Sequence, residues 1–213
     1  MQTNSLQKQL ALSGLLMGIV ALVLQFYFIL NNRTASIPET IIRFFSFFTI
    51  LTNCLVAVAF ASIAAGSKSK WNSFFSKRSV FTAVTVYILV VGLVYNVILR
   101  WQWNPQGWEK LADELLHTVI PLYVLLFWWL FVSAQTLKLK DVLPWLWYPL
   151  IYCAYTLLRG SFVDFYPYPF MDVLKLGYST VILNSLYVTF AFLVVSFLLV
   201  ALGKWKSVKE INA

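Results

Sequence analysis

Apolar residues along the chain form long continuous runs, separated by short polar segments, and do not follow the 3.6-residue spacing of a half-exposed helix. A hydrocarbon core of about 30 Å needs roughly 20 apolar residues in a helix. Stretches that meet or nearly meet this length lie near residues 10–30, 42–65, 80–99, 111–132, 142–158 and 175–202. The pattern therefore predicts an all-α fold, a polytopic six-transmembrane-helix bundle that forms one integral membrane domain over residues 1–213.

Composition supports a lipid environment, because 61% of the residues are hydrophobic and only 11% are charged. A net charge of +8 would also suit nucleic acid, but the basic residues are spread over short loops and tails. Ten of the 16 Lys and Arg residues fall in the N-terminal leader, the 66–78 loop, the 133–141 loop and the C-terminal tail. By the positive-inside rule, both termini are expected in the cytoplasm and the chain in the inner (plasma) membrane. No nucleic-acid partner is expected.

The second apolar run carries hydroxyl and amide groups on one face. Thr49 and Asn53 are four residues apart and Thr49 and Thr52 are three apart, so all three share a side of a helix. One interpretation is structural, because such groups commonly bond to backbone carbonyls or to a neighbouring helix. The other is that one threonine hydroxyl acts in chemistry.

The fourth run contains the only histidine, His117, with Asp113 four residues earlier on the same face. A carboxylate in that position can orient an imidazole and stabilise its charged form. Pro121 cannot donate a hydrogen bond to the His117 carbonyl, so this oxygen is free and the helix is expected to bend. A purely structural histidine tied to Asp113 is the alternative interpretation.

Thr49 and His117 lie at matching depth in their predicted helices. Each is about six or seven residues from the outer face, which places both roughly 10 Å below the surface at about 1.5 Å per residue. A hydroxyl and a base at equal depth can meet if their helices are neighbours.

Further polar residues lie in the outer halves of the predicted spans, and we expect them to line an outward-facing cavity. Asn96 precedes Arg100 by one turn at the outer end of the third helix, where Arg100 either reaches the lipid headgroups or binds an anionic group. Arg159 opens an aromatic, proline-rich loop that is expected to cap the bundle, and Asn184 lies at similar depth in the last helix.

Metal and haem chemistry have little support in the residue inventory. One histidine and two separated cysteines make neither a zinc cage nor a bis-histidine haem site. A carboxylate ion site around Asp113 and Glu114 stays open as an alternative. We expect no metal and no cofactor.

Four motifs carry a family resemblance: Phe48-Thr49-Ile50-Leu51-Thr52-Asn53, His117-Thr118-Val119-Ile120-Pro121, Arg159-Gly160 and Tyr166-Pro167-Tyr168-Pro169-Phe170. With these, the chain resembles the bacterial six-transmembrane branch of the androgen-induced-gene (FAR/AIG-like) membrane protein family. The animal members are threonine hydrolases that cleave fatty acid esters of hydroxy fatty acids, using one intramembrane Thr and one His. The resemblance implies His117 as the base and Thr49 as the nucleophile, with Thr52 as the alternative nucleophile.

The leading hypothesis is therefore an intramembrane lipid-ester hydrolase. Thr49 attacks the ester carbonyl, His117 takes and returns the proton, and Asp113 orients the imidazole. Asn53, Asn96 and Arg100 are the candidate oxyanion donors, and Arg159 and Asn184 are further candidates for substrate binding. The rival hypothesis is a lipid or small-molecule transporter or binding protein without chemistry. In either case the expected partners are membrane lipids or a fatty-acid ester, and the expected state is a monomer or weak homodimer.

Overall fold

The computed structural model describes residues 4–66, 70–132 and 137–211, and every regular element within these residues is helical. The α-helices are α1 (Ser5–Asn31), α2 (Ile37–Phe44), α3 (Phe48–Ala65), α4 (Lys70–Phe75), α5 (Arg78–Val94), α6 (Gly107–Glu114), α7 (Ile120–Phe131), α8 (Val142–Trp145), α9 (Trp147–Val163) and α10 (Val173–Ile211). Single π turns, η1 (Tyr95–Leu99) and η3 (Leu115–Val119), extend α5 and join α6 to α7. Short 3₁₀ turns are η2 (Arg100–Gln102), η4 (Leu139–Asp141) and η5 (Pro169–Met171).

Within the described residues, five helical segments are long and apolar enough to cross a membrane. They are Ser5–Asn31, Phe48–Ala65, Arg78–Gln102, Gly107–Phe131 and Val173–Lys206. Their backbone groups are paired inside each helix, which is what a hydrocarbon environment requires. The prediction of an all-helical membrane protein is confirmed at this level.

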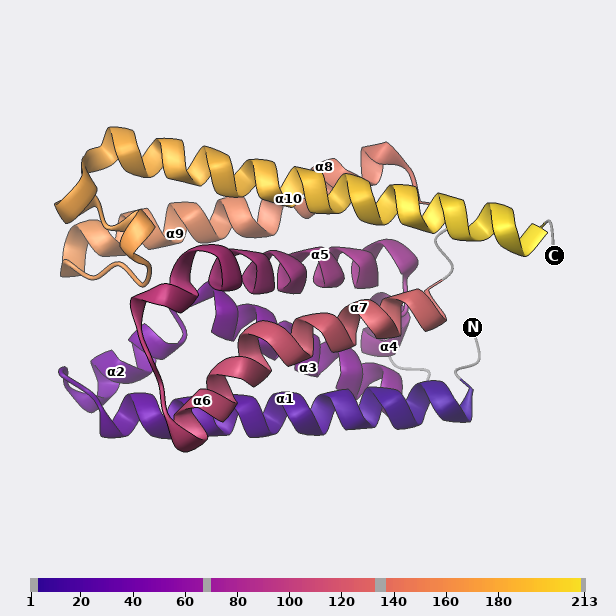
Figure 1. Ribbon diagram of the computed structural model, residues 1–213, viewed down its shortest axis with the longest axis horizontal. Helices are drawn as coiled ribbons and strands as arrows, with labels where there is room; N and C mark the ends of the chain where they lie inside the picture. Colours follow the sequence, from indigo (N-terminus) through magenta and orange to yellow (C-terminus); the bar gives the residue numbers. More distant parts are fainter. Residues whose placement is uncertain (1–3, 67–69, 133–136, 212–213) are drawn as a thin grey trace.

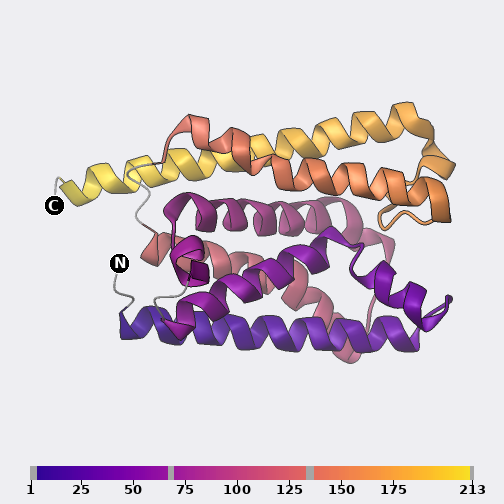
Figure 2. The same cartoon turned by 180° about the vertical axis from the view of Figure 1, so that it is seen from behind.

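The helices form an elongated bundle with α5 at its centre (Figures 1 and 2). On one side, α5 packs against α3 and α7, and both of these contact α1. On the other side, α5 packs against α10, which runs beside α9 (Figures 1 and 2). Since α5 has neighbours on both sides, it is the most deeply buried of the five apolar segments.

The helix predicted over 42–65 is in fact two helices, α2 and α3, with a break at Phe45–Phe47. Tertiary contacts stabilise this break, because the Tyr152 hydroxyl donates to the Ser46 carbonyl (2.8 Å) and the Ser46 hydroxyl donates to the Ile42 carbonyl (2.7 Å). Thr49 therefore lies in the first turn of α3, and it is not about seven residues inside a continuous helix. The helix predicted at 142–158 is likewise divided into α8 and α9 and continues to Val163.

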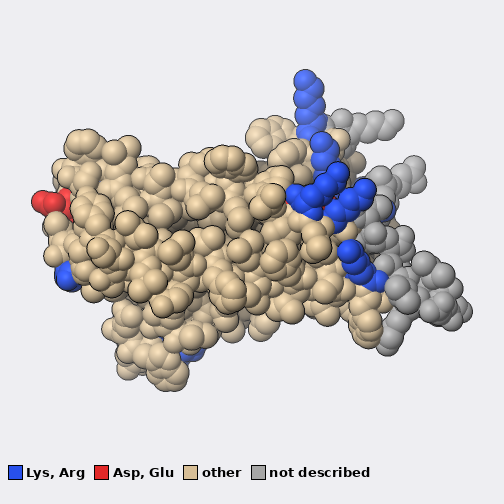
Figure 3. Space-filling model, turned by 90° about the horizontal axis from the view of Figure 1, so that it is seen from above, with Lys and Arg blue, Asp and Glu red and all other residues tan. Residues whose placement is uncertain are grey.

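The first described turn of α1 and the last turn of α10 lie at the same end of the bundle (Figure 1). The opposite end holds η1, α2 and the loop before α10. On the face drawn in Figure 3, Lys and Arg side chains gather at the end where the chain begins and finishes, and acidic side chains appear at the opposite end. Two members of the predicted basic side, Lys68 and the side chain of Lys209, lie outside the described residues. We call the α2 end the loop end below.

Close packing of α1 depends on Gly14. A Cβ atom at this position would lie 2.5 Å from Phe60 Cε2 and 2.9 Å from Tyr123 Cε1. Neither ring is free to move, because Phe60 is fully buried and the Tyr123 hydroxyl donates to the Leu10 carbonyl (2.7 Å). Gly18, one turn further along the same helix, has only Ala57 Cβ nearby, at 3.7 Å.

This difference between two glycines of one helix predicts their response to alanine. Gly14→Ala should lower the free energy of unfolding by about 1–3 kcal/mol, the usual cost of overpacking a close-packed interior. Gly18→Ala, the matched control, should be neutral or raise it by up to about 1 kcal/mol, because alanine favours the helix. Unfolding in detergent measures both. Equal effects of the two substitutions would contradict the close contact at Gly14.

Candidate functional site

The two π turns are in contact with each other. One is η1, at the end of α5, and the other is η3, between α6 and α7. Such turns are rare and are frequent at functional sites. Asn96 joins them, because its side-chain amide donates to the carbonyl oxygens of Gly92 (2.8 Å) and His117 (3.1 Å). The His117 oxygen is the one that Pro121 leaves free. The Asn96 side chain of η1 therefore bonds both to its own helix and to η3.

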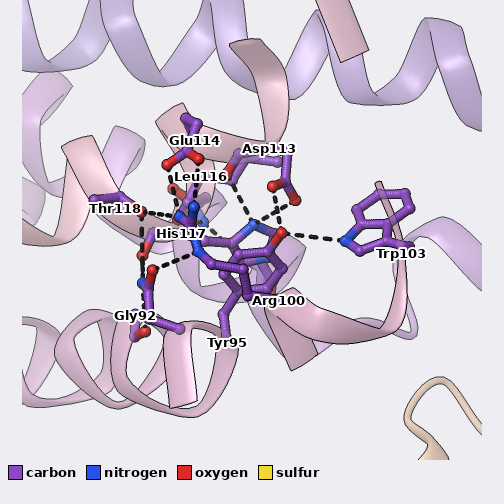
Figure 4. A network of polar contacts seen from close by, with 12 residues as sticks. Gly92, Tyr95, Arg100, Trp103, Asp113, Glu114, Leu116, His117 and Thr118 are labelled. Carbon is purple, nitrogen blue, oxygen red and sulfur yellow. Dashed lines mark hydrogen bonds and ion pairs between the residues drawn. The ribbon is translucent and has the colours of Figure 1, made fainter. Parts of the chain in front are cut away.

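The imidazole of His117 has a defined orientation (Figure 4). Its Nδ1 lies 2.9 Å from the backbone oxygen of Asp113 and 3.1 Å from the Asp113 Oδ1. A carbonyl oxygen only accepts hydrogen bonds, so Nδ1 is the donor and Nε2 of the neutral ring is an acceptor. The Tyr95 ring stacks on the imidazole, with centroids 3.8 Å apart and planes 13° apart.

Asp113 is buried, at 2% exposure, and is held from two sides. The Tyr95 hydroxyl donates to its Oδ2, and Trp103 Nε1 in turn donates to the Tyr95 hydroxyl at 3.1 Å (Figure 4). The His117 Nδ1 lies beside the other oxygen of Asp113, Oδ1, at 3.1 Å. Asp113, His117 and Tyr95 thus form one cluster, which we call the histidine cluster.

Arg100 holds the same two turns together beside the histidine cluster. Its guanidinium forms a fork with Glu114, with both N–O distances at 2.7 Å, and Nη2 donates to Thr118 Oγ1 at 3.0 Å. Its Nε donates to Asn96 Oδ1 at 2.9 Å. Bidentate pairs of this kind combine strength with fixed geometry. The polar groups of Asn96 and Arg100 are therefore used in contacts between helices, and neither residue lines the cavities described below.

Thr49 is the second residue of α3 and is held by Tyr168, from the loop before α10. The Thr49 backbone N–H donates to the Tyr168 hydroxyl at 3.1 Å, and the Thr49 Oγ1 lies 3.3 Å from the same hydroxyl. Asn53 Nδ2 donates to the Thr49 carbonyl at 2.9 Å and approaches the Leu116 carbonyl at 3.4 Å. These contacts link the start of α3 both to the loop end and to η3.

Thr49 and His117 line one cavity of about 540 Å³. Tyr95 and Tyr168 line it too, and its walls towards the loop end include Arg33 and Arg43. Among the described residues, no hydrogen bond joins the side chains of Thr49 and His117. The structure places the two groups at a common cavity and leaves the hydroxyl bonded to Tyr168.

A second cavity, of about 290 Å³, lies among α5, α9 and α10. Four residues line both cavities: Thr49, Tyr95, Leu99 and Tyr168. Thr49 and Tyr168 therefore lie where the two cavities meet. We call the 540 Å³ space the polar cavity and the 290 Å³ space the apolar cavity.

The other two polar residues of the predicted Thr49 face are buried away from both cavities. Thr52 is fully buried, with its hydroxyl 3.3 Å from the Tyr148 hydroxyl. Asn53 is 1% exposed, and within the described residues its Oδ1 has no hydrogen-bond partner. Of the two threonines considered as nucleophiles, only Thr49 reaches a cavity.

Arg159 and Asn184 hold the loop that carries Tyr168. Arg159 Nη2 donates to Glu39 Oε1 at 2.7 Å, and Asn184 Nδ2 donates to the Phe170 carbonyl at 2.9 Å. The guanidinium carbons of Arg43 and Arg159 lie 4.4 and 5.5 Å from the centre of the Phe165 ring. The loop is thereby fixed to α2, α9 and α10, and neither Arg159 nor Asn184 lines the two cavities.

Two aromatic residues at this site were not predicted to take part. The sequence assigned no role to Tyr95, and Tyr168 was considered only as part of a loop expected to cap the bundle. The Pro-Tyr-Pro spacing around Tyr168 was a usable signal, because two prolines restrict the backbone on both sides of the ring. The sequence contains no comparable signal for the stacking of Tyr95 on His117.

Fold and site together define a helical, multi-pass membrane protein in which a histidine beside a buried carboxylate lines a cavity. Within the described residues, no three His, Cys, Asp or Glu side chains lie close enough to hold a metal ion. No protein-family model, curated protein or solved structure matches the chain.

The ion pairs at the loop end predict a pH dependence. Hydrogen bonds from Arg43, and next from Arg159, hold the pKa of Glu39 below its ordinary value of 4.5. A lowered folded-state pKa stabilises the protein above pH 4.5, and this contribution is lost as the pH falls through the lowered value. The gain should be about 1 kcal/mol or less, as for ion pairs near a surface.

Thermal unfolding of the wild type and of Glu39→Gln between pH 3 and pH 7 measures this contribution. The wild type should be the more stable near pH 7, and the difference should shrink below pH 4.5. A difference that stays constant over the whole range would contradict the assignment to Glu39.

Proposed function

We propose that this protein is an intramembrane lipid-ester hydrolase in which Thr49 is the nucleophile and His117 the base. The observation that carries the proposal is that both residues line the polar cavity, with the imidazole oriented by Asp113 so that Nε2 is free to accept a proton. Fatty acid esters of hydroxy fatty acids are the substrate class suggested by the sequence resemblance. The rival proposal, a lipid transporter or binding protein, uses the same cavities without chemistry.

In the proposed reaction, Thr49 Oγ1 attacks the ester carbonyl carbon while His117 Nε2 takes the hydroxyl proton. The tetrahedral intermediate then breaks the bond to the alcohol oxygen, which leaves with the proton from His117. Water attacks the resulting acyl-threonine, with His117 again taking and returning the proton, and the free acid and Thr49 hydroxyl are restored. Asp113 stabilises the imidazolium that forms in each half of the cycle.

An imidazole and a threonine hydroxyl must come within about 2.6–3.2 Å to react, and catalytic hydrogen bonds are often incomplete without substrate. The Thr49 hydroxyl is bonded to Tyr168, so the substrate has to displace or share this contact. The Tyr168 hydroxyl, 3.3 Å from Thr49 Oγ1, is then well placed to donate to the developing oxyanion. Asn53, Asn96 and Arg100, the donors considered from sequence, are held by backbone or side-chain partners.

We also propose that α8 and α9 form a sixth span and that both termini lie in the cytoplasm of a cell whose inner (plasma) membrane holds the protein. In support, α9 runs beside α10 along the bundle (Figure 2), and at about 1.5 Å per residue its 17 residues extend roughly 25 Å. The gathering of basic side chains near the chain ends agrees with the positive-inside rule (Figure 3).

Single cysteines in a Cys54→Ser/Cys153→Ser background test this topology. A membrane-impermeant maleimide added to intact cells should label Asn104→Cys and Ser161→Cys, which the proposal puts outside. Lys140→Cys should react only after the membrane is opened. Labelling of Lys140→Cys and Ser161→Cys from the same side would remove the sixth span.

Substitution of the two threonines, one at a time, tests the nucleophile. Thr49→Ala should abolish covalent labelling by a phosphonate probe and lower kcat for a fatty-acid ester by about 10³-fold or more, as for the loss of a catalytic nucleophile. His117→Ala should act similarly. Ser62→Ala is the control, because Ser62 is half-buried on α3 and lines neither cavity, and it should behave like the wild type. Loss of labelling in Thr52→Ala alone would transfer the role to Thr52, and undiminished labelling in both threonine variants would exclude the mechanism.

A further inference from the structure

The apolar cavity has walls of a different character from those of the polar cavity. Its lining comes from the first turn of α3, α5 with η1, α9, α10 and the segment from Tyr168 to Met171. No Lys, Arg, Asp or Glu residue is among the residues that line it. The polar cavity, by comparison, is lined by Arg33, Arg43 and Glu109 as well as aromatic rings. The two halves of a bound molecule would therefore meet different environments on the two sides of Thr49.

The few hydroxyl groups in the wall of the apolar cavity are already used within the protein. The Ser185 hydroxyl donates to the Val181 carbonyl and the Thr189 hydroxyl donates to the Ser185 carbonyl, both at 2.8 Å. The Tyr152 hydroxyl donates to the Ser46 carbonyl at 2.8 Å. Groups that are satisfied in this way offer little to a polar ligand, so the cavity favours a hydrocarbon.

The cavity also extends in a direction that suits a lipid chain. From Tyr168 and Thr49 at the loop end, it continues along α10 from Ile182 to Phe192, which is roughly 15 Å at about 1.5 Å per residue. Leu150, Ile182 and Leu186 line it and are also 46%, 54% and 60% exposed on the molecular surface. The cavity thus opens sideways between α9 and α10, towards the acyl chains of the membrane.

We infer that the apolar cavity binds the fatty-acyl chain of the substrate, with the ester carbonyl at Thr49 and the alcohol part in the polar cavity. This inference rests on the proposed function for the position of the carbonyl. Burial of the chain contributes roughly 0.8 kcal/mol for each methylene removed from water, so cavity length sets the preferred chain length. Tyr168, which lines both cavities, separates the acyl side from the alcohol side.

A binding experiment tests the acyl-chain site without requiring any hydrolysis. Full-length protein is irradiated with a long-chain fatty acid that carries a diazirine at its methyl end, and the crosslinked residues are mapped by mass spectrometry. Crosslinks should fall on cavity residues of α9 and α10. Ser185→Trp, which fills the cavity, should lower this labelling by about tenfold or more, the effect of losing roughly two buried methylenes.

Leu183→Trp is the matched control, because Leu183 lies on the same helix, is exposed and does not line the cavity. It should label like the wild type. If Ser185→Trp fails to fold by size-exclusion chromatography, Ser185→Leu gives a smaller obstruction in the same place. Labelling that is spread over the lipid-facing surface, or that is equal in the Ser185 and Leu183 variants, would overturn the acyl-chain site.

Hydrolysis of 4-nitrophenyl esters of different chain length provides the second measurement. Ser185→Trp should lose activity on the long-chain ester while it retains activity on the acetate, and Leu183→Trp should keep the wild-type profile. Cavity crosslinks in a protein that hydrolyses none of the esters would support the acyl-chain site and remove the hydrolase. Hydrolysis with an unchanged chain-length profile and no cavity crosslinks would remove the acyl-chain site alone.

Discussion

The contact between Asp113, His117 and Tyr95 is the interaction on which the rest of the site depends. A carboxylate buried in an apolar helix bundle is costly unless the protein itself supplies its hydrogen bonds. Here Tyr95 supplies one from η1, and the oriented imidazole lies against the other oxygen. These contacts join η1, at the end of α5, to α6 and η3. The polar cavity lies next to the pair of Asp113 and His117, because His117 forms part of its lining.

Several interruptions of helical backbone lie near this cluster. These interruptions lie towards the loop end. They are the break between α2 and α3, the turns η1 and η3, and the non-helical Gly177 near the start of α10. An interrupted helix leaves backbone groups that need other partners. At the α2–α3 break the Tyr152 hydroxyl donates to the Ser46 carbonyl, and at η3 the Asn96 side chain donates to the His117 carbonyl. Non-helical backbone at membrane depth is tolerated where the protein buries it or where it lines a cavity. Elsewhere in the described residues, neighbouring helices pack through aromatic rings, as around Phe60.

Thr49 lines both cavities from the first turn of α3, at the loop end of the bundle. Its backbone N–H is one of the groups that a helix start leaves without an internal partner, and the Tyr168 hydroxyl accepts from it. The same tyrosine contacts the Thr49 hydroxyl and stacks on Phe170, with ring centroids 5.3 Å apart. A loop distant in sequence thus determines where the hydroxyl points. This arrangement places a polar and an apolar space on the two sides of one threonine.

The amino-acid sequence by itself indicated that this protein lies in a lipid membrane, and it determined contacts between residues close together in the chain. Long apolar runs require a helical membrane protein, and spacing of four residues puts Asp113 beside His117 within one helix, because that contact needs only helical geometry. Pro121 likewise freed the His117 oxygen. Only the tertiary structure decided which groups from different helices meet. The packing of helices and loops brings Tyr95 onto His117 and Tyr168 onto Thr49. It also brings Arg100 and Arg159 into ion pairs. The break at Ser46 depends on Tyr152, more than a hundred residues away, so no local pattern contains it.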